Sequence, residues 1–495
     1  MMPLRVLLSL LGGTFITLAL APFNWVPLVF LAPACLYFAV RNCSLLQATL
    51  LGWLFGCALF GTGSSWVFVS IHEHSATPLP VALLLTTLFV TVLALLFALQ
   101  TYLWRRWFSD QLPVAGFIGI WLLFEWTRSW LFTGFPWLYL GYATLDTPLA
   151  TWLPIGGVWL GSLAVLLIAA GLIQTLQKRQ PRWLLLAVLP WTGLLLPDQW
   201  TTETSQNLTV ALVQPDIPQN DKWIPDNRSW ILERYIDLTG PLDDQQLIVW
   251  PETAIPAFFN QTVDTLAPLL DQLDQQGSTL LSGMPTLTRD PQRPSGYRVH
   301  NSLVLLTGSS GVYHKQRLVP FGEYLPLENW LRGLVAFFNL PMSSFSLPKE
   351  SQPLLKVQGL SLSAAICYEI AYPGLVREMS RAADIMLTVS NDTWFGDSIA
   401  PAQHLQIAQA RALENGRWLL RGTNNGITAL INPQGKVTAQ LPQFETGVLQ
   451  GQVSAMAGAT PYQRLGDWPV LAIMALLLLS SMAAFSRRLH RQMHG

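Results

Sequence analysis

Two kinds of hydrophobic pattern divide the chain. Residues 1–198 consist mainly of long apolar runs, each near the length that crosses a hydrocarbon layer of about 30 Å. Residues 199–460 are polar and contain only short apolar runs, and one more long run follows within 461–495. The pattern predicts about eight membrane helices, seven before the polar region and one after it. The predicted spans are 4–21, 25–40, 45–70, 80–104, 113–131, 153–176, 182–197 and 467–486.

The charged residues indicate how these spans are oriented. Lys and Arg follow the fourth, sixth and eighth spans, whereas the loops at 22–25 and 70–80 contain neither. Because cytoplasmic loops of membrane proteins carry the excess of Lys and Arg, both termini are expected in the cytoplasm. The polar region then lies on the far side of the membrane, which in a bacterium is the periplasm.

The polar region alternates short β-rich runs with helical patterns. This alternation predicts an α/β domain in which helices cover a sheet and polar groups gather at strand ends. The predicted helices are 229–238, 262–276 and 401–415, with Gly416 ending the last one. The predicted strands are 208–213, 247–250, 279–282, 302–306, 362–366, 385–389, 418–421 and 427–431.

Composition narrows the classes of function. Only 12% of the residues are charged, against about 25% in an ordinary soluble domain, and 51% are hydrophobic. The formal net charge of zero argues against nucleic acid as a partner. Of the four cysteines, Cys367 alone lies in the polar region, so a free thiol is expected there.

Three chemically useful side chains follow predicted strands. Cys367 ends the apolar run 362–366, Glu252 ends the run that begins at 247, and Lys315 follows the run 302–306. A thiol, a carboxylate and an amine at strand ends can act as nucleophile, base and charge stabiliser. A lone cysteine in an apolar run is more often an inert core residue, and only the partner motifs favour a nucleophile here.

Five motifs in one order resemble the nitrilase superfamily. They are Trp-Pro-Glu at 250–252, the Lys315 motif at 313–324, Ile-Cys-Tyr-Glu at 366–369, and the segments 390–395 and 422–426. The membrane spans, with the segments 124–128 and 134–137, are similar to the membrane-bound branch of that superfamily, the apolipoprotein N-acyltransferases. The resemblance implies an αββα sandwich as the polar domain.

The resemblance also implies roles for individual residues. Glu252 would be the general base, Lys315 the stabiliser of an oxyanion, and Cys367 the nucleophile. Supporting or substrate-contacting roles are expected for Glu323, Tyr368, Glu369 and Trp223. No cofactor and no metal is expected, since His72 and His74 lack the spacing of a metal site.

Residues 325–340 are unusually apolar for a polar domain. The segment contains Trp330 and Phe338 and directly follows the Lys315 motif. A core helix is one interpretation of this pattern. The preferred interpretation is a lid that touches lipid beside the site, with Trp330 and Phe338 as substrate contacts.

Many spans suggest that the substrate comes from the bilayer. The residues themselves indicate acyl transfer from a lipid ester to an amine through a thioester on Cys367. The resemblance implies that a phospholipid donates its sn-1 chain to the diacylglyceryl-cysteine of an apolipoprotein, at the inner membrane of a bacterium. A monomer is expected. The alternatives are a membrane-anchored amidase or hydrolase, and a transporter with a periplasmic binding domain.

Overall fold

The computed structural model describes residues 2–75, 77–110, 112–293, 295–326 and 344–494, with side chains up to residue 483. It contains two compact units. The first comprises Met1–Phe68, Leu79–Asp198 and Arg464–Gly495, and the second comprises Val69–Pro78 and Gln199–Gln463. Residues 69–78, which the hydrophobic pattern places in the membrane region, therefore group with the polar domain.

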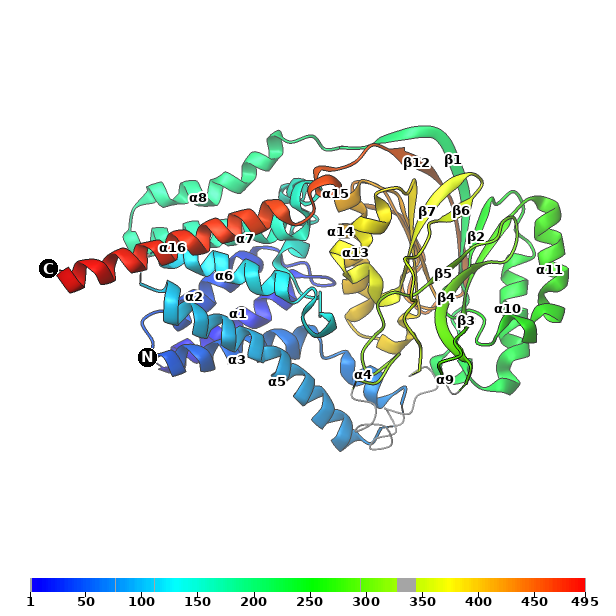
Figure 1. Ribbon diagram of the computed structural model, residues 1–495, viewed down its shortest axis with the longest axis horizontal. Coiled ribbons are helices and arrows are strands. Elements are labelled where there is room, and N and C mark those ends of the chain that lie inside the picture. Colours follow the sequence, from blue (N-terminus) through cyan, green and yellow to red (C-terminus); the bar gives the residue numbers. More distant parts are fainter. Residues whose placement is uncertain (1, 76, 111, 294, 327–343, 495) are drawn as a thin grey trace. The chain divides into compact units, whose positions relative to one another are not determined.

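The first unit is helical (Figure 1). By length and composition, four of its described segments could cross a membrane: Met2–Ala19, Leu45–Gly63, Leu79–Phe108 and Pro148–Lys178. Its helices are α1 (Met2–Ala19), α2 (Pro27–Val40), α3 (Leu45–Gly63), α5 (Leu79–Leu103), α6 (Pro113–Thr127), α7 (Leu153–Lys178), α8 (Leu184–Val188) and α16 (Trp468–His494). The short helix α4 (Val67–His72) continues from this unit into the second one.

Four of the eight expected spans coincide with apolar stretches of only 10–17 described residues, the last of which lies within the longer helix α16. They correspond to the apolar segments Pro27–Val40, Pro113–Thr127, Pro181–Leu195 and Trp468–Ala483. A helix of 14 residues such as α2 rises only about 21 Å, because each residue adds about 1.5 Å. In the third of these segments, residues Leu189–Leu195 form a 3-10 helix that contains a proline and a glycine. Among the described residues, four segments are therefore long and apolar enough to cross a membrane, and the other four spans stay a prediction.

Helix α5 has an apolar face that the described residues leave exposed. Leu84, Leu88 and Leu95 are each more than half exposed. A contiguous apolar surface of this kind is unfavourable in water and suits contact with lipid. Polar residues instead face inward on α6, where Glu125 accepts a hydrogen bond from the backbone N–H of Leu140 at 3.1 Å. Glu125 therefore braces the chain just after the 134–137 segment.

The second unit is a sandwich of two six-stranded sheets. One has the order β12-β1-β2-β3-β4-β5 and the other β11-β10-β9-β8-β7-β6. The first sheet contains β1 (Thr202–Gln214), β2 (Leu247–Val249), β3 (Thr279–Arg289), β4 (Tyr297–Leu305), β5 (Val312–His314) and β12 (Gly447–Ala457). The second contains β6 (Leu355–Val357), β7 (Leu360–Ile366), β8 (Ile385–Ser390), β9 (Leu419–Thr423), β10 (Ala429–Ile431) and β11 (Val437–Gln440).

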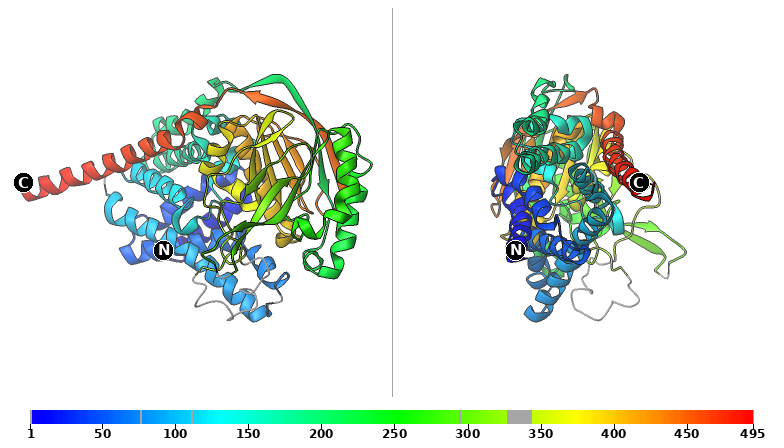
Figure 2. Two further views of the ribbon diagram at one scale, coloured as in Figure 1. Left: turned by 45° about the vertical axis from the view of Figure 1, so that its right-hand side comes forward. Right: turned by 90° about the vertical axis from the view of Figure 1, so that its left-hand side faces the viewer.

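Helices cover the outer faces of both sheets (Figures 1 and 2). Helices α10 (Arg228–Thr239) and α11 (Val263–Gln276) pack on the first sheet, and α13 (Pro373–Ser380) and α14 (Ala400–Asn415) on the second. Alternate residues of β1 point in opposite directions: Val210 and Leu212 into the core between the sheets, Ala211 and Val213 toward α10 and α11. The expected αββα sandwich is confirmed.

All predicted strands and helices of this domain are present. Among the elements that the sequence analysis missed are the helices α9 (Gln219–Lys222) and α13 and the strands β5, β6, β11 and β12. Strands β5 and β6 have only three residues each, too few for a periodic pattern. Strand β12 contains Gly and Gln and is only partly buried, so it does not show the apolar run of a central strand.

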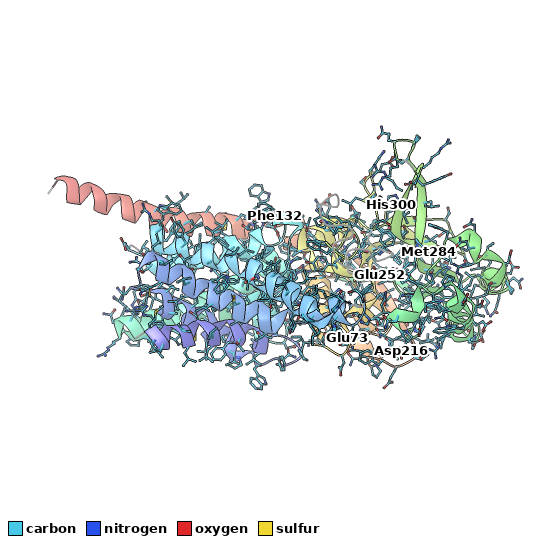
Figure 3. The ribbon with its side chains drawn as sticks, turned by 90° about the horizontal axis from the view of Figure 1, so that it is seen from below. Glu73, Phe132, Asp216, Glu252, Met284 and His300 are labelled. Carbon is cyan, nitrogen blue, oxygen red and sulfur yellow. The ribbon has the colours of Figure 1, made fainter. Side chains whose placement is uncertain are left out.

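Parallel pairing brings the catalytic candidates to strand ends. Strands β1, β2 and β3 run parallel, as do β7, β8 and β9. Glu252 follows β2, and Cys367 directly follows β7. The chain at Glu252 lies close against Gly283 of β3, where an added Cβ would come within 2.8 Å of the Cα of Glu252. Figure 3 labels Glu252, which follows β2, together with Met284 of β3 and His300 of β4.

Candidate active site

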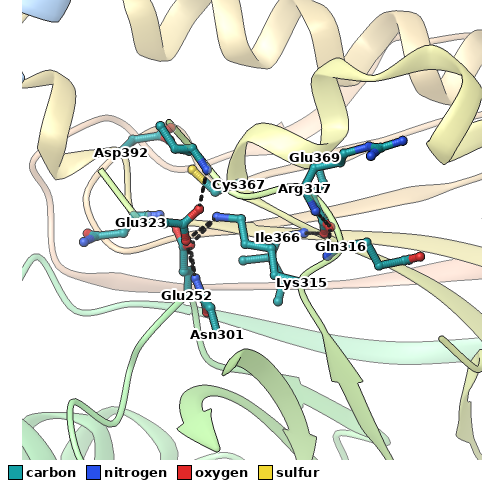
Figure 4. A network of polar contacts seen from close by, with 12 residues as sticks. Glu252, Asn301, Lys315, Gln316, Arg317, Glu323, Ile366, Cys367, Glu369 and Asp392 are labelled. Carbon is teal, nitrogen blue, oxygen red and sulfur yellow. Dashed lines mark hydrogen bonds and ion pairs between the residues drawn. The ribbon is translucent and has the colours of Figure 1, made fainter. Parts of the chain in front are cut away.

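A buried lysine lies between two carboxylates at the ends of these strands (Figure 4). The Nζ of Lys315 is 3.1 Å from Glu252 Oε1 and 2.8 Å from Glu323 Oε1. Asn301 on β4 donates its side-chain amide to the same two oxygens, at 2.8 and 2.9 Å. All four residues are at most 5% exposed. The cluster therefore holds one positive and two negative charges away from water.

The second oxygen of each carboxylate is also held. Glu252 Oε2 accepts the backbone N–H of Asn391 at 2.9 Å, and Glu323 Oε2 accepts that of Val319 at 2.8 Å. Lys222 donates to the backbone carbonyl of Glu252 at 3.2 Å. Such a fully bonded carboxylate has little freedom to rotate, so the Glu252 side chain is set in one direction.

These contacts determine the charges of Glu252 and Lys315 at neutral pH. Burial raises the pKa of Glu252, but the charge of Lys315 and the hydrogen bonds from Asn301 and Asn391 outweigh it and hold that pKa below its usual value. Burial lowers the pKa of Lys315, but Glu252 and Glu323 outweigh it and hold that pKa well above its usual value. At neutral pH Glu252 is therefore an ionised base and Lys315 a cation.

The thiol beside this cluster is protonated at rest. Burial, then the negative charge of Glu252, raise the pKa of Cys367 well above its usual value, although Lys315 lowers it. Cys367 is partly exposed and has a positive φ of 54°, an uncommon backbone conformation for a residue with a Cβ. Because the thiolate is the reactive form, Cys367 needs a base to take its proton, and Glu252 is charged and close enough to influence it.

Glu369 joins the loop of Lys315 to the turn of Cys367. Its Oε1 accepts the backbone N–H groups of Gln316 at 2.5 Å and Arg317 at 3.0 Å. Its Oε2 accepts the N–H of Ile366 at 2.7 Å and the hydroxyl of Tyr313 at 2.9 Å. Burial raises the pKa of Glu369 to about 7, while these donors pull it down. The side chain thus ties two strand ends from different sheets together.

Of the remaining predicted residues, the structure describes Tyr368 and Trp223. Tyr368 packs edge-on against Tyr372, with ring centroids 5.3 Å apart. Trp223 is partly buried against an apolar group that includes Leu318 and Phe345. Trp330 and Phe338, and with them most of the expected lid, fall outside the described residues.

Several residues around the site were not singled out from the sequence. Asn301 lies on β4 just before the predicted apolar run 302–306, and its role depends on two carboxylates that are distant in the chain. Lys222 is buried, and burial lowers its pKa to about 8 although Glu252 raises it. Asn391 and Asn424 belong to motifs that were noted without a role; the Asn424 amide donates to Ile217 O at 2.7 Å and to Asn391 Oδ1 at 3.2 Å.

Comparisons with known proteins match both parts of the chain. Residues 12–171 match the model of the apolipoprotein N-acyltransferase N-terminal domain, and residues 209–462 match that of the carbon-nitrogen hydrolases. An apolipoprotein N-acyltransferase of Pseudomonas syringae pv. tomato is 45% identical over 484 residues, which cover 95% of either chain. The chain belongs to the apolipoprotein N-acyltransferase family.

The family likeness extends beyond one genus. An apolipoprotein N-acyltransferase of Vibrio parahaemolyticus is 38% identical, and the match covers 96% of each chain. Among solved structures, yeast Nit3 of the nitrilase superfamily is 18% identical, with a TM-score of 0.37 over 50% of this chain and 91% of that one. The apolipoprotein N-acyltransferase relatives therefore span the membrane helices and the sandwich alike.

Proposed function

We propose that the chain transfers an acyl group, the sn-1 chain of a phospholipid, to the α-amino group of the diacylglyceryl-cysteine of an apolipoprotein. Membership of the apolipoprotein N-acyltransferase family makes the chain a membrane-bound acyltransferase. The observation that carries the finer proposal is the buried cluster of Glu252, Lys315 and Glu323 beside a free, partly exposed Cys367. Such a cluster supports a base, a cation and a nucleophile acting on one carbonyl.

The first half of the reaction forms a thioester. Glu252 takes the proton of Cys367 as the sulfur attacks the ester carbonyl, and negative charge passes to the carbonyl oxygen. Lys315 stabilises that oxyanion, because a preorganised charge in a water-poor site acts strongly where charge develops. The intermediate collapses, Glu252 returns the proton to the leaving alkoxide, and lysophospholipid departs. Glu323 holds Lys315 in place throughout.

The second half transfers the acyl group to nitrogen. The α-amino group attacks the thioester carbonyl, and Lys315 again stabilises the oxyanion. Glu252 removes a proton from the attacking nitrogen and passes it to the departing sulfur. The products are an amide and the Cys367 thiol, so the enzyme returns to its first state. This ping-pong order requires the two lipid substrates to occupy the same site in turn.

In a transferase an amine attacks the thioester, whereas in a hydrolase water does. The purified protein, in vesicles with phospholipid labelled in the sn-1 chain, is expected to acylate a diacylglyceryl-cysteinyl peptide with a free α-amine. Labelled amide should exceed labelled free fatty acid by about tenfold or more. The matched control is the same peptide with an acetylated amine, which should form no amide. Free fatty acid released equally fast with both peptides would establish a hydrolase instead.

We further propose eight spans in the inner membrane, both termini in the cytoplasm, and residues 199–460 in the periplasm, with the protein acting as a monomer. The alternation of Lys and Arg between loops supports this orientation. Alkaline phosphatase fused after residue 200 is expected to be active, and a fusion after residue 180 inactive. The opposite result would place the sandwich in the cytoplasm and exclude the proposed orientation.

A further inference from the structure

A second buried polar network lies behind the nucleophile, on the main-chain side of Cys367. The imidazole Nε2 of His404, on α14, is 3.2 Å from the backbone carbonyl oxygen of Cys367. Its Nδ1 is 3.1 Å from Asp392 Oδ1 and 3.3 Å from Arg421 Nη2. Arg421 also donates to Asp392 Oδ2 at 2.6 Å. The three side chains are at most 1% exposed.

Each member of this network is held by a different element of the second sheet and its covering helix. Asp392 follows β8, His404 is on α14, and Arg421 is on β9, where its Nε donates to the carbonyl of Ile427 at 3.1 Å. Gly426 lies against Asp392, and a Cβ there would come within 2.7 Å of the Asp392 Cβ. The network is therefore rigid, and it fixes the imidazole ring of His404.

The contact with Cys367 has a defined polarity. A carbonyl oxygen only accepts hydrogen bonds, so Nε2 of His404 must carry the hydrogen. The guanidinium of Arg421 balances the carboxylate of Asp392 and also faces Nδ1. The side of the ring away from Cys367 is thus fully occupied, which leaves the Nε2–H to point at Cys367.

The carbonyl that receives this bond belongs to a residue in an uncommon conformation. Cys367 has φ of 54° and begins the short 3-10 helix Cys367–Ala371 at the end of β7. A residue with a Cβ stays in this left-handed region only when its surroundings hold it there. Because the carbonyl carbon is bonded to the Cα that carries the side chain, a shift of the main chain at this carbonyl would move the Cα and Cβ, and with them the sulfur.

We infer that His404 is a positioning residue, which Asp392 and Arg421 orient so that it holds the Cys367 carbonyl and thereby aims the thiol at the substrate. His404 acts through the main chain and takes no part in proton transfer. The inference rests on the proposed role of Cys367 as nucleophile. The role of His404 differs from those of Glu252 and Lys315. His404 sets the direction from which the sulfur attacks and does not change the charges around the substrate carbonyl.

Two polar substitutions of His404 test whether its hydrogen bond to the Cys367 carbonyl matters, or only its packing. The amide nitrogen of glutamine reaches about as far as Nε2 of histidine, whereas asparagine reaches only about as far as Nδ1. His404→Gln is expected to acylate Cys367 within about 5-fold of the wild-type rate. His404→Asn is expected to be slower by about 50-fold or more, since a misplacement of about 1 Å can cost a factor of 100.

The measurement is the single-turnover rate of acyl transfer from labelled phospholipid to Cys367, per folded molecule, at several phospholipid concentrations. The half-saturating concentration should stay unchanged in both variants, because neither contacts the lipid. Glu414→Gln, in a buried ion pair on the same helix, is the control: it should lower the melting temperature without slowing acylation. Loss of rate in His404→Asn with rescue in His404→Gln supports the inference.

Other results would contradict either the positioning role of His404 or the proposed function. Equal rates in His404→Asn and wild type would overturn the inference, as would equal slowing of His404→Asn, His404→Gln and Glu414→Gln, which indicates a packing effect. Failure of the wild-type protein to form any acyl-enzyme would overturn the proposed function itself. The two failures are therefore distinguishable in one set of reactions.

Discussion

Cys367→Ala is expected to abolish both the acyl-enzyme and the transfer reaction. Incubation of the wild-type protein with labelled phospholipid should leave label on the protein that neutral hydroxylamine releases, because a thioester is cleaved under conditions that spare an amide. The alanine variant has no nucleophile, so both the label and the amide product should fall by at least about 1,000-fold, within the span that covalent catalysis commonly contributes.

The control for this variant is Cys57→Ala. Cys57 is a free thiol in α3 of the helical unit, and it should form no part of the reaction. Its replacement is expected to leave labelling unchanged. Hydroxylamine-labile label that persists in Cys367→Ala would exclude Cys367 as the acylated residue. Full biological function in that variant would favour the transporter alternative.

Lys315→Met is expected to be damaging in two separate ways. Loss of the cation leaves Glu252 and Glu323 buried and facing the same space, which costs about 3–5 kcal/mol of stability. It also removes the proposed oxyanion stabiliser, which should slow acylation by about 100- to 1,000-fold. Chemical denaturation measures the first effect, and single-turnover labelling of the folded fraction measures the second.

The double variant Lys315→Met with Glu323→Gln distinguishes the two effects. Removal of one buried negative charge should recover part of the stability, yet it restores no cation at the carbonyl, so acylation should stay slow. Lys349→Met is the matched control, since the Lys349 side chain is 62% exposed and its ion-pair partner at 3.7 Å, Asp290, keeps the nearer Arg298; the change should alter stability by less than about 1 kcal/mol. Recovery of acylation in the double variant would contradict a role for the Lys315 charge in the reaction.

Loss of Lys315 should also change the titration of the thiol. The cation lowers the pKa of Cys367 against burial and the neighbouring carboxylates, so its removal raises that pKa further. A smaller fraction of thiolate is then present at any given alkaline pH. Alkylation of Cys367 by iodoacetamide between pH 8 and pH 10 should therefore be slower in Lys315→Met, with its rise shifted to higher pH.

Much of the site was predictable because its key residues lie in short local motifs. Glu252, Lys315 and Cys367 each follow an apolar run, and their motifs in this order resemble the nitrilase superfamily, which implied their roles. The structure brings Glu252, Lys315 and Glu323 into direct contact and places Glu369 on the backbone of both neighbouring loops. The catalytic roles themselves stay predictions.

The partners of these residues were not predictable in the same way. Asn301 matters because two carboxylates meet its amide, and they come from positions 49 and 22 residues away. His404 matters because it reaches the carbonyl of Cys367, 37 residues earlier. Neither contact leaves a periodic or compositional trace, since each depends on strand pairing and helix packing and not on neighbours in sequence.

The sequence by itself determined the two regions of this protein, their helical or α/β character and the motif residues of the site, because hydrophobic periodicity and local motifs are properties of adjacent residues. Only the tertiary structure decided that residues 69–78 group with the sandwich and that several apolar segments are short helices. It also decided the charges at the site. Those depend on burial and on atoms within a few ångströms of each other, which a linear sequence does not specify.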